Sequence, residues 1–522
     1  MIPCIDSADQ TPTATMHSAG RPVCAILTRC FTVVFEEFPV ALLAQPVVLK
    51  SNLVMLFEHL AGVPWSLFLD TATATHTNAR FDMVFYEPVR TYQLSGDTIT
   101  VGSAVDSAAD STVDNKHDQQ RMATCATYPA SQWQPLLRED VASLPSYTGP
   151  AHLPFQGGLA GAFGYDFGRQ LEQLNAQADA DIDLPELAVA LYHKALIFDK
   201  QQQQLYLLAP ESQWQQEAAL WQGLAERPKQ PQPEQSFKLL QPWQSNLTAA
   251  DYAHKFAQVM QHLRQGDCYQ INLAQRFSSC YEGSEWDAYL RLRAHNQGPF
   301  SAFMQLETGA ILSLSPERFI ALDTEGNIET KPIKGTRPRH SNATLDQQAA
   351  AELQQASKDR AENVMIVDLL RNDLSRVCDP GSVSVPALFK IESFPAVHHL
   401  VSTVHGKLSA DHDMLDIIAA TFPGGSITGA PKISAMNIID KLEPHRRSFY
   451  CGSMGYISQH GAADTSIMIR TLVCANQQIY CWAGGGLVMD SECAAEYQET
   501  FDKVGHILPI LAETAETTEP EL

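Results

Sequence analysis

The chain has 522 residues, of which 45% are hydrophobic and 18% are charged, so it is long enough to bury a large core. Its formal net charge of -23 argues against nucleic acid or an anionic membrane surface as a partner. The 11 cysteines contain no Cys-x-x-Cys pair, which predicts reduced thiols rather than a disulfide framework.

The first part of the chain predicts a flexible start followed by a short helix. Residues 1–40 begin with a Thr- and Ala-rich leader, which we expect to be a flexible N-terminal extension. The apolar stretch 23–49 is interrupted by charges, so it predicts neither a signal peptide nor a membrane span. We therefore expect a cytoplasmic protein. Regular structure should begin with a helix over 51–62, capped by Ser51 and ended by Gly62.

Two strands are predicted after this helix, PWSLFLDTA at 64–72 and ARFDMVFYEP at 79–88. The stretch 96–146 is polar, with clusters of Asp, Ser and Thr, and predicts an inserted surface loop. The segment PFQGGLAGAFGYDFGRQLE at 154–172 has glycines that suit a tight strand crossing, which indicates a structural role.

A change in composition predicts how the chain is divided. Residues 226–244 are rich in Pro and Gln, which is typical of a linker. We therefore expect an N-terminal half over 41–225, a catalytic region over 245–511 and an acidic tail over 512–522. The catalytic region should open with an amphipathic helix that Gly266 ends, followed by the strand CYQINLAQRF.

The stretch ILSLSPERFIALDTEGNIETKPIKGTRPR at 311–339 carries the most informative pair of residues. Its Gly-Asn dipeptide between two alternating runs predicts a hairpin with a turn at 323–327. Such a hairpin can bring Glu317 and Lys334 to the same end of one sheet. A carboxylic acid and an amine facing one pocket can serve as proton donor and nucleophile. Each residue taken alone also fits an ordinary solvated surface charge.

Two pairs of acidic residues are candidates for holding a metal ion. A helix predicted over 357–377 carries Asp359 and Glu362 three residues apart, and a helix near the C-terminus carries Glu496 and Glu499 with the same spacing. Either pair alone is most simply a solvated helix face. If the two pairs converge, their oxygens make a hard site that suits Mg²⁺.

The remaining candidate elements can bind anions. The Gly-rich loop in FPGGSITGAPKISAMNIIDKLE at 422–443 enters a helix, where Thr428 can cap and Pro431 suits the first turn. It does not match the P-loop pattern. Arg470 can hold a carboxylate with two hydrogen bonds, and the three glycines at 484–486 let backbone N–H groups approach a carboxylate closely.

SPERF, which contains Glu317, followed by PIKGT, which contains Lys334, resembles the chorismate-utilising enzymes. The resemblance covers most of residues 154–504. Within that family, PIKGT is similar to the aminodeoxychorismate synthases, since anthranilate synthases carry Ala at the Lys334 position. The resemblance implies an α+β fold in which antiparallel β-sheets are packed between helices, an anthranilate synthase-like α/β/β/α sandwich.

The resemblance also implies a reaction in which chorismate and ammonia give 4-amino-4-deoxychorismate, on the route to 4-aminobenzoate and folate. Lys334 would attack ring C2 while Glu317 protonates the departing C4 hydroxyl, and ammonia would then enter at C4 and expel the lysine. Glu317 must have a raised pKa to stay protonated, and Lys334 a lowered pKa to offer a free amine. Gln270 stands where isochorismate and salicylate enzymes carry a water-activating Lys. An amide is a poor base, so Gln270 favours amination.

The same resemblance assigns further site residues. It places Mg²⁺ at Glu362 and Glu499, with Glu496 as the next ligand and Asp359 in the outer shell. The implied substrate-binding residues are Gln270, Thr336, His399, Gly425, Thr428, Tyr456, Arg470, Gly484, Gly485 and Gly486.

The sequence also bears on the source of nitrogen and leaves two alternative functions. The chain contains no Gly-x-Cys-x-Gly elbow of a glutamine amidotransferase, so ammonia should come from solution or from a separate amidotransferase subunit. One alternative is an anthranilate synthase, against which Lys334 counts. The other is a non-catalytic protein that binds an aromatic amino acid at Asp70 and Thr71, where family members have such a site. Ordinary strand-end residues are the favoured interpretation there.

Overall fold

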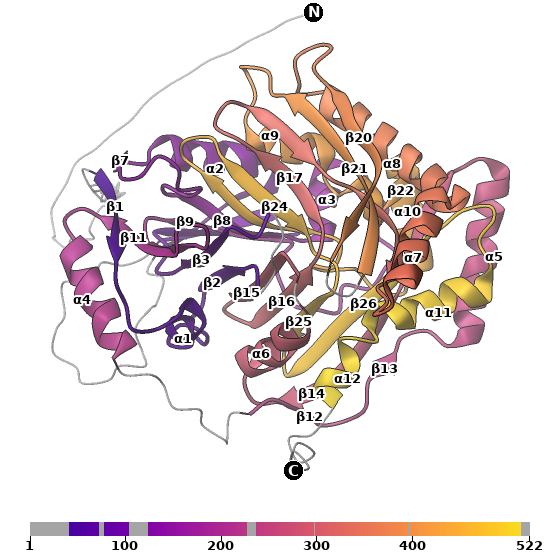
Figure 1. The fold of residues 1–522 in the computed structure, drawn as a ribbon, viewed down its shortest axis with the longest axis horizontal. Coiled ribbons are helices and arrows are strands. Elements are labelled where there is room, and N and C mark those ends of the chain that lie inside the picture. Colours follow the sequence, from indigo (N-terminus) through magenta and orange to yellow (C-terminus); the bar gives the residue numbers. More distant parts are fainter. Residues whose placement is uncertain are drawn as a thin grey trace, which may run out of the picture. The chain divides into compact units, whose positions relative to one another are not determined.

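The computed structural model describes residues 41–72, 78–103, 124–226, 236–296, 298–394 and 397–512. These residues form two large sheets with helices packed on them, which confirms the predicted α+β class (Figure 1). The predicted leader and almost all of the predicted acidic tail lie outside the described residues. Among the residues described, no helix is long and apolar enough to cross a membrane. The described cysteines are free, as predicted.

The first sheet contains strands from both sides of the predicted linker. For example, β2 pairs with β15 in antiparallel register, Phe68 opposite Phe303. Its described strands, in order across the sheet, are β12 (Lys238–Leu239), β14 (Gln270–Glu282), β26 (Gln478–Leu487), β25 (Thr471–Ala475), β16 (Gly309–Ser315), β15 (Phe300–Gln305), β2 (Leu67–Asp70), β3 (Phe81–Phe85), β10 (Ala195–Asp199), β11 (Gln204–Pro210), β1 (Ala41–Val47) and β7 (Ser146–Thr148), with β13 (Gln244–Ser245) and β22 (Gly429–Ala430) beside β14.

The second sheet carries the hairpin that the sequence predicts. It too joins both parts of the chain, since β8 pairs with β23, Ala160 opposite Tyr456. Its described strands, in order, are β19 (Ile333–Pro338), β21 (Val397–Lys407), β18 (Asn327–Thr330), β17 (Arg318–Leu322), β24 (Ala463–Ile467), β23 (Ser453–Ser458), β8 (Gly158–Phe163), β9 (Leu187–Tyr192), β4 (Arg90–Ser95), β5 (Thr98–Ser103) and β6 (Thr124–Pro129), with β20 (Ser384–Ser393) beside β21.

Helix α5 ends at the residue that the sequence predicts. In α5, Thr248 and Asp251 form a capping box, and Gly266 ends the helix at a φ of 80°. The described helices are α1 (Leu53–Phe57), α2 (Trp133–Ala142), α3 (Gly168–Leu171), α4 (Trp214–Ala225), α5 (Ala249–Gln265), α6 (Glu285–His295), α7 (Ala343–Gln355), α8 (Ser357–Ser375), α9 (Met414–Thr421), α10 (Lys432–Leu442), α11 (Cys493–Val504) and α12 (Leu508–Ala512), with short 3₁₀ turns η2 (Ala130–Gln132), η3 (Tyr165–Phe167) and η5 (Gly425–Ile427).

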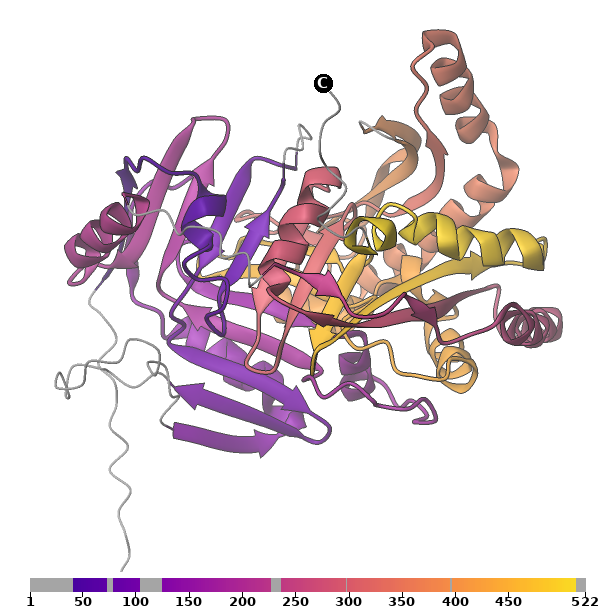
Figure 2. The same cartoon turned by 90° about the horizontal axis from the view of Figure 1, so that it is seen from below.

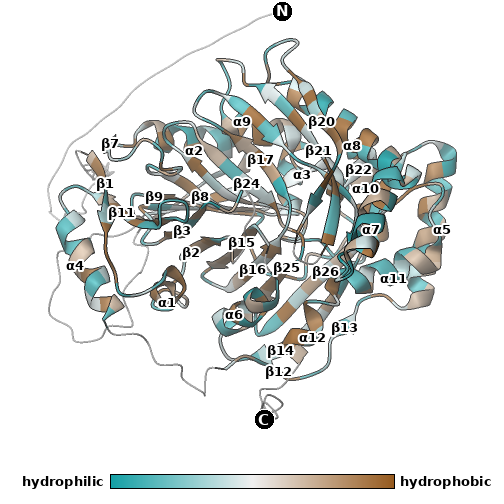
Figure 3. Cartoon of the chain, in the orientation of Figure 1, coloured by the Kyte–Doolittle hydropathy of each residue, from teal (hydrophilic) through white to brown (hydrophobic). Residues whose placement is uncertain are grey.

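The hydrophobic core fills the space between the two sheets and continues under the helices. Between the sheets, Phe85 of β3 lies 5.5 Å from Tyr192 of β9, measured between ring centroids. On the other face of the first sheet, α1 and α6 pack on β15 through Phe57 and Trp286. Figure 3 shows brown along strands such as β26 and teal on helices such as α4 and α7. Apolar residues of the strands therefore contribute to the hydrophobic core together with those of the helices.

The first predicted helix is shorter than expected. It spans Leu53–Phe57 instead of 51–62, and its N-cap is Asn52, whose side chain accepts from the Met55 N–H at 3.0 Å. The expected cap at Ser51 and the expected stop at Gly62 were therefore wrong. The helix ends early because the His59 and Leu60 N–H groups bond three residues back, which tightens the chain into turns.

The expected surface loop over 96–146 was also wrong in its described part. That part contains β5, β6 and α2, and α2 packs into the core through Trp133 and Leu137. The apolar residues Ile99 and Val101 alternate with polar ones along β5, a pattern that the overall polarity of the stretch conceals. Residues 104–123 lie outside the described residues.

Candidate active site

The hairpin brings Glu317 and Lys334 together, as predicted. Its turn is held by the Asp323 carboxylate, which accepts from the backbone N–H of Asn327 at 2.8 Å. Glu317 lies between β16 and β17, and its Oε1 faces the backbone N–H of Ile333 at 3.4 Å. Lys334 follows directly in β19 and donates from Nζ to the carbonyl oxygen of Ser426 at 2.9 Å.

Glu317 is buried and Lys334 is half-buried, and loss of solvent shifts both pKa values in the predicted directions. Burial raises the pKa of Glu317 to about 7, although the positive charge of Lys334 opposes the shift. Burial lowers the pKa of Lys334, although the carboxylates of Glu362 and Glu317 oppose that change. A protonated acid beside a neutral amine is the combination that proton donation and nucleophilic attack require.

Helices α8 and α11 bring the predicted acidic residues towards this pair. Burial raises the pKa of Glu362 on α8, with the charges of Lys334 and Lys358 acting against it. Glu496 on α11 accepts from Lys358 at 3.0 Å and from the Ser491 hydroxyl at 2.6 Å. The described helices α8 and α11 are therefore linked by an ion pair at this point.

Glu499 lies one turn further along α11. Burial favours its neutral form, but Lys503 lies 2.7 Å away and keeps the pKa of Glu499 below its usual range. Lys503 also donates to the carbonyl oxygen of Gly484 at 2.7 Å. Figures 1 and 2 show the yellow helix α11 beside the end of β26.

The three glycines of β26 are needed because other groups occupy the space of their missing side chains. A Cβ on Gly485 would lie 3.1 Å from Glu496 Oε2 and 3.6 Å from Glu499 Oε1. A Cβ on Gly486 would lie 2.0 Å from Nε2 of Gln270 on β14. The Oε1 atom of Gln270 is buried and has no hydrogen-bond partner among the described residues. At this edge, the site therefore presents the side-chain amide of Gln270 and backbone atoms that no side chain covers.

The Gly-rich loop lies against Lys334 from another side. A Cβ on Gly425 would lie 2.6 Å from Cδ2 of Leu369 on α8, so a larger residue there would require the leucine side chain to move. The Thr428 hydroxyl donates to the Gly424 carbonyl at 3.0 Å. Thr428 therefore closes the loop, and the prediction that it caps the following helix was wrong. Pro431 occupies the N-cap position, directly before the first turn of α10.

Thr336, His399 and Arg470 form a second polar group. The Thr336 hydroxyl lies 2.8 Å from Nδ1 of His399, on neighbouring strands β19 and β21. Burial, assisted by the charge of Arg470, lowers the pKa of His399 to about 3, so its imidazole is neutral. No hydrogen bond or ion pair joins the Arg470 guanidinium to another described residue. Arg470 is therefore available to a carboxylate.

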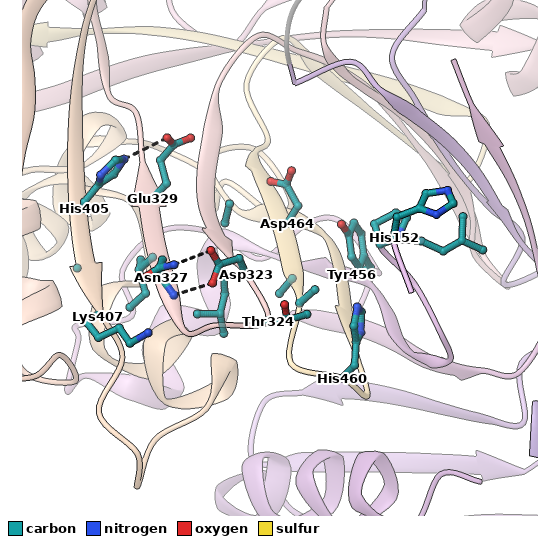
Figure 4. A pocket seen from close by; sticks show the side chains of 18 of the residues that line it. His152, Asp323, Thr324, Asn327, Glu329, His405, Lys407, Tyr456, His460 and Asp464 are labelled. Atoms are coloured by element: carbon teal, nitrogen blue, oxygen red, sulfur yellow. Dashed lines mark hydrogen bonds and ion pairs between the residues drawn. The ribbon is translucent and has the colours of Figure 1, made fainter. Parts of the chain in front are cut away.

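Tyr456, in contrast, lies elsewhere. Its side chain lines a groove of about 810 Å³ together with His152, His460 and Asp464 (Figure 4). Burial raises the pKa of the Tyr456 hydroxyl, and Asp464 adds to the shift. The structure therefore does not bring Tyr456 to the group around Lys334.

Asp70 and Thr71 hydrogen-bond within the protein. The Asp70 carboxylate accepts from the Tyr289 hydroxyl at 2.9 Å and from Nη2 of Arg293 at 3.1 Å. The Thr71 hydroxyl donates to Oδ1 of Asp82 at 2.6 Å. These contacts match the favoured interpretation of structural strand-end residues. Residues 73–77, which follow, lie outside the described residues.

Sequence reasoning missed three contributors, namely Ser426, Lys358 and Lys503. The spacing of Lys503, four residues after Glu499 on one helix, was a usable signal for an ion pair. Lys358 pairs with Glu496 across 138 positions, which no local pattern can predict. Ser426 contributes its backbone carbonyl, and any residue type supplies that group.

Comparison with known proteins shows that the chain belongs to one family. The family model described as chorismate binding enzyme matches residues 87–509. The aminodeoxychorismate synthase component 1 of Escherichia coli strain K12 is 48% identical over 456 residues, which are 87% of this chain and 94% of that protein. The protein of the same name from Salmonella typhimurium is also 48% identical, with the same coverage.

Solved structures show the same fold. The anthranilate synthase component I of Streptococcus pneumoniae aligns with a TM-score of 0.69 and 28% identity, covering 89% of this chain and 99% of that one. The isochorismate synthase MenF of Escherichia coli aligns with a TM-score of 0.64 at 16% identity, and this likeness concerns the fold alone.

Proposed function

Since this chain belongs to the family of chorismate-binding enzymes, we propose that it converts chorismate and ammonia to 4-amino-4-deoxychorismate, for 4-aminobenzoate and folate biosynthesis. The observation that carries this proposal is the half-buried Lys334 beside the buried Glu317, with pKa shifts in opposite directions. The names of the relatives from Escherichia coli and Salmonella typhimurium support it.

The reaction uses Lys334 as the first nucleophile. Its neutral amine forms a bond to ring C2, the double bonds of the ring shift, and the C4–O bond breaks. Glu317 gives its proton to the departing C4 hydroxyl, which leaves as water. Ammonia then forms a bond to C4, the double bonds shift back, and the C2–N bond to Lys334 breaks. The surplus proton of the ammonia returns to Glu317, so chorismate and ammonia give the product and water.

The surrounding groups would hold the substrate and exclude a competing hydration. Arg470 is placed to bind the carboxylate of the enolpyruvyl side chain, beside the neutral His399–Thr336 pair. The remaining sides of the substrate would contact the backbone of Gly484 to Gly486, the loop at Gly425 and Thr428, and the amide of Gln270. The Gln270 amide cannot act as a base at neutral pH, so water is not activated from this side.

Mg²⁺ is the cofactor that the acidic residues fit. The carboxylates of Glu496 and Glu499 both lie near the backbone of Gly485, which has no side chain. Glu362 adds a half-buried carboxylate with a raised pKa. No three His, Cys, Asp or Glu side chains in the described part of the chain form a complete metal site. When bound, Mg²⁺ would neutralise the ring carboxylate of chorismate.

The metal assignment predicts a specific change in Mg²⁺ dependence. Replacing Glu362 with glutamine keeps the side-chain shape but removes the charge, so the Mg²⁺ concentration for half-maximal activity should rise about tenfold or more. Steady-state rates measured against Mg²⁺ concentration test this. The control is Asp368→Asn, which removes an exposed carboxylate on the same helix. An unchanged Mg²⁺ response in Glu362→Gln would contradict the assignment.

The nitrogen supply can be tested on the isolated chain. The relatives are named component 1, and we propose a separate glutamine amidotransferase subunit as the partner. The pure protein should therefore turn over chorismate with ammonium at alkaline pH, where free ammonia is available, and should fail with glutamine alone. Assay of both nitrogen sources in parallel checks this. Sustained turnover with glutamine by the pure chain would contradict it.

The rival activity is that of an anthranilate synthase, the named activity of the solved structure with 28% identity. The two reactions differ in the fate of the enolpyruvyl group, because anthranilate formation releases pyruvate. We expect the products from chorismate, Mg²⁺ and ammonium to contain 4-amino-4-deoxychorismate and no stoichiometric pyruvate. Chromatography of the products with a pyruvate assay distinguishes the two. Pyruvate released in step with chorismate consumption would replace the proposed function by its rival.

A further inference from the structure

The strand that carries Lys334 is irregular at that point. Along β19 and β21, Ile333 lies opposite Val401 and Thr336 lies opposite His399. Three steps along β19 therefore correspond to two steps along β21, so β19 contains one extra residue. Gly335 adopts a φ of +77°, which is in the left-handed region. An extra residue with a glycine at positive φ is a β-bulge, a device that redirects side chains.

The bulge directs neighbouring side chains of β19 to separate parts of the site. Lys334 reaches the carbonyl of Ser426 on the Gly-rich loop, and Thr336 reaches His399 on β21. The direction of the nucleophile thus depends on the backbone conformation at Gly335.

Side chains from two helices, Leu353 of α7 and Asp359 of α8, approach Gly335 closely. A Cβ on Gly335 would lie 2.8 Å from Cγ and 2.9 Å from Oδ1 of Asp359, and 2.8 Å from Cδ1 of Leu353. The end of a leucine side chain can rotate away. Asp359 is less free, because it stands in the first turn of α8 and accepts from Nη2 of Arg337 at 3.3 Å. Glu362 lies three residues further along the same helix.

We propose that Gly335, packed without a side chain against Asp359, is a positioning residue that fixes the direction of Lys334. The contact also connects the nucleophile to α8, the helix that carries Glu362. This inference rests on the proposed function, since it assumes that Lys334 attacks chorismate. It assigns Asp359 a steric role, beside the outer-shell metal role expected from the sequence.

A matched pair of alanine substitutions separates positioning from backbone strain. Gly381 has a φ of +79° and nothing within 4 Å of its Cβ position. Gly335→Ala and Gly381→Ala therefore impose the same left-handed strain, but only Gly335→Ala meets Asp359. The measurement is the rate of the covalent adduct on Lys334 when chorismate and Mg²⁺ are supplied without ammonia, with chorismate binding measured by calorimetry.

We expect Gly335→Ala to slow adduct formation about 100-fold while chorismate binding changes little, because small displacements of a reacting group have effects of this size. Gly381→Ala should stay within about twofold of the wild type. Compared with Asp359→Ala alone, which accounts for the outer-shell metal role of Asp359, the double variant Gly335→Ala/Asp359→Ala should regain much of the lost rate, since the carboxylate that a Cβ at Gly335 would meet is removed. Asp359→Glu tests the same contact with Gly335 intact, and should also slow the adduct even if Gly335→Ala fails to fold.

Three outcomes would overturn the inference. They are a wild-type adduct rate in Gly335→Ala, an equal loss in Gly381→Ala, and no recovery in the double variant. A wild type that forms no adduct would contradict the proposed nucleophile itself. An adduct that forms equally well in the wild type and Gly335→Ala would contradict only the positioning role.

Discussion

Replacing Lys334 with alanine should reduce formation of 4-amino-4-deoxychorismate by about 10³-fold or more, in a protein that still folds and binds chorismate. The substitution removes the half-buried amine that makes the first bond to the substrate. It leaves Glu317, Gln270 and the acidic residues of α8 and α11 in place. Since these groups remain, residual amination should appear at C2, where ammonia can attack directly.

The measurement for Lys334→Ala is the initial rate with ammonium, together with identification of every product. Lys331→Ala is the matched control, because Lys331 lies three residues earlier and pairs with Glu392 at 2.7 Å outside the catalytic pair. The control should retain most of the activity. Formation of the C4 amine at the wild-type rate by Lys334→Ala would show that Lys334 is not the nucleophile.

Replacing Glu317 with glutamine should lower the rate by about 10²- to 10⁴-fold, the usual contribution of a general acid. Glutamine has nearly the same shape but no acidic proton to give to the C4 hydroxyl. Glu329→Gln is the control, because Glu329 also borders the hairpin but pairs with Arg318 at 2.6 Å. A Glu317→Gln enzyme with the rate of the wild type would show that another group donates the proton.

The pH dependence gives an independent check on Glu317. Its pKa of about 7 means that the carboxyl is protonated below that pH and loses its proton above it. Adduct formation by the wild type without ammonia should therefore slow as the pH rises through about 7. Glu317→Gln should lack this alkaline decline. The lowered pKa of Lys334 has the opposite role, since it keeps the amine neutral at lower pH than for an exposed lysine.

The sequence predicted those features of the site that depend on local patterns. The turn at Asp323 to Asn327 is encoded by its own residues, so the hairpin and the meeting of Glu317 with Lys334 could be foreseen. The glycine that ends α5, Gly266, is an equally local signal. The pKa directions followed from the chemistry that the two residues would need.

Features that depend on pairing between distant strands were not predictable. The bulge at Gly335 can be defined only from the pairing of β19 with β21. Asp359, which packs against Gly335, comes from helix α8. Tyr456 fits the family pattern, but the side to which a strand residue points depends on how the sheets pack, and β23 turns it towards the groove. Residues 96–146 were misjudged because the apolar positions of β5 and α2 are few among polar neighbours.

Mass spectrometry of the peptide that contains Lys334 tests directly whether Lys334 forms a covalent intermediate with chorismate. The wild-type protein is mixed with chorismate and Mg²⁺, ammonia is withheld, and the reaction is quenched and digested. We expect this peptide to gain the mass of chorismate less one water. Added ammonium should then release the bound group as 4-amino-4-deoxychorismate and restore the unmodified peptide. An unmodified Lys334 peptide in a preparation that still makes 4-amino-4-deoxychorismate when ammonium is added would contradict it.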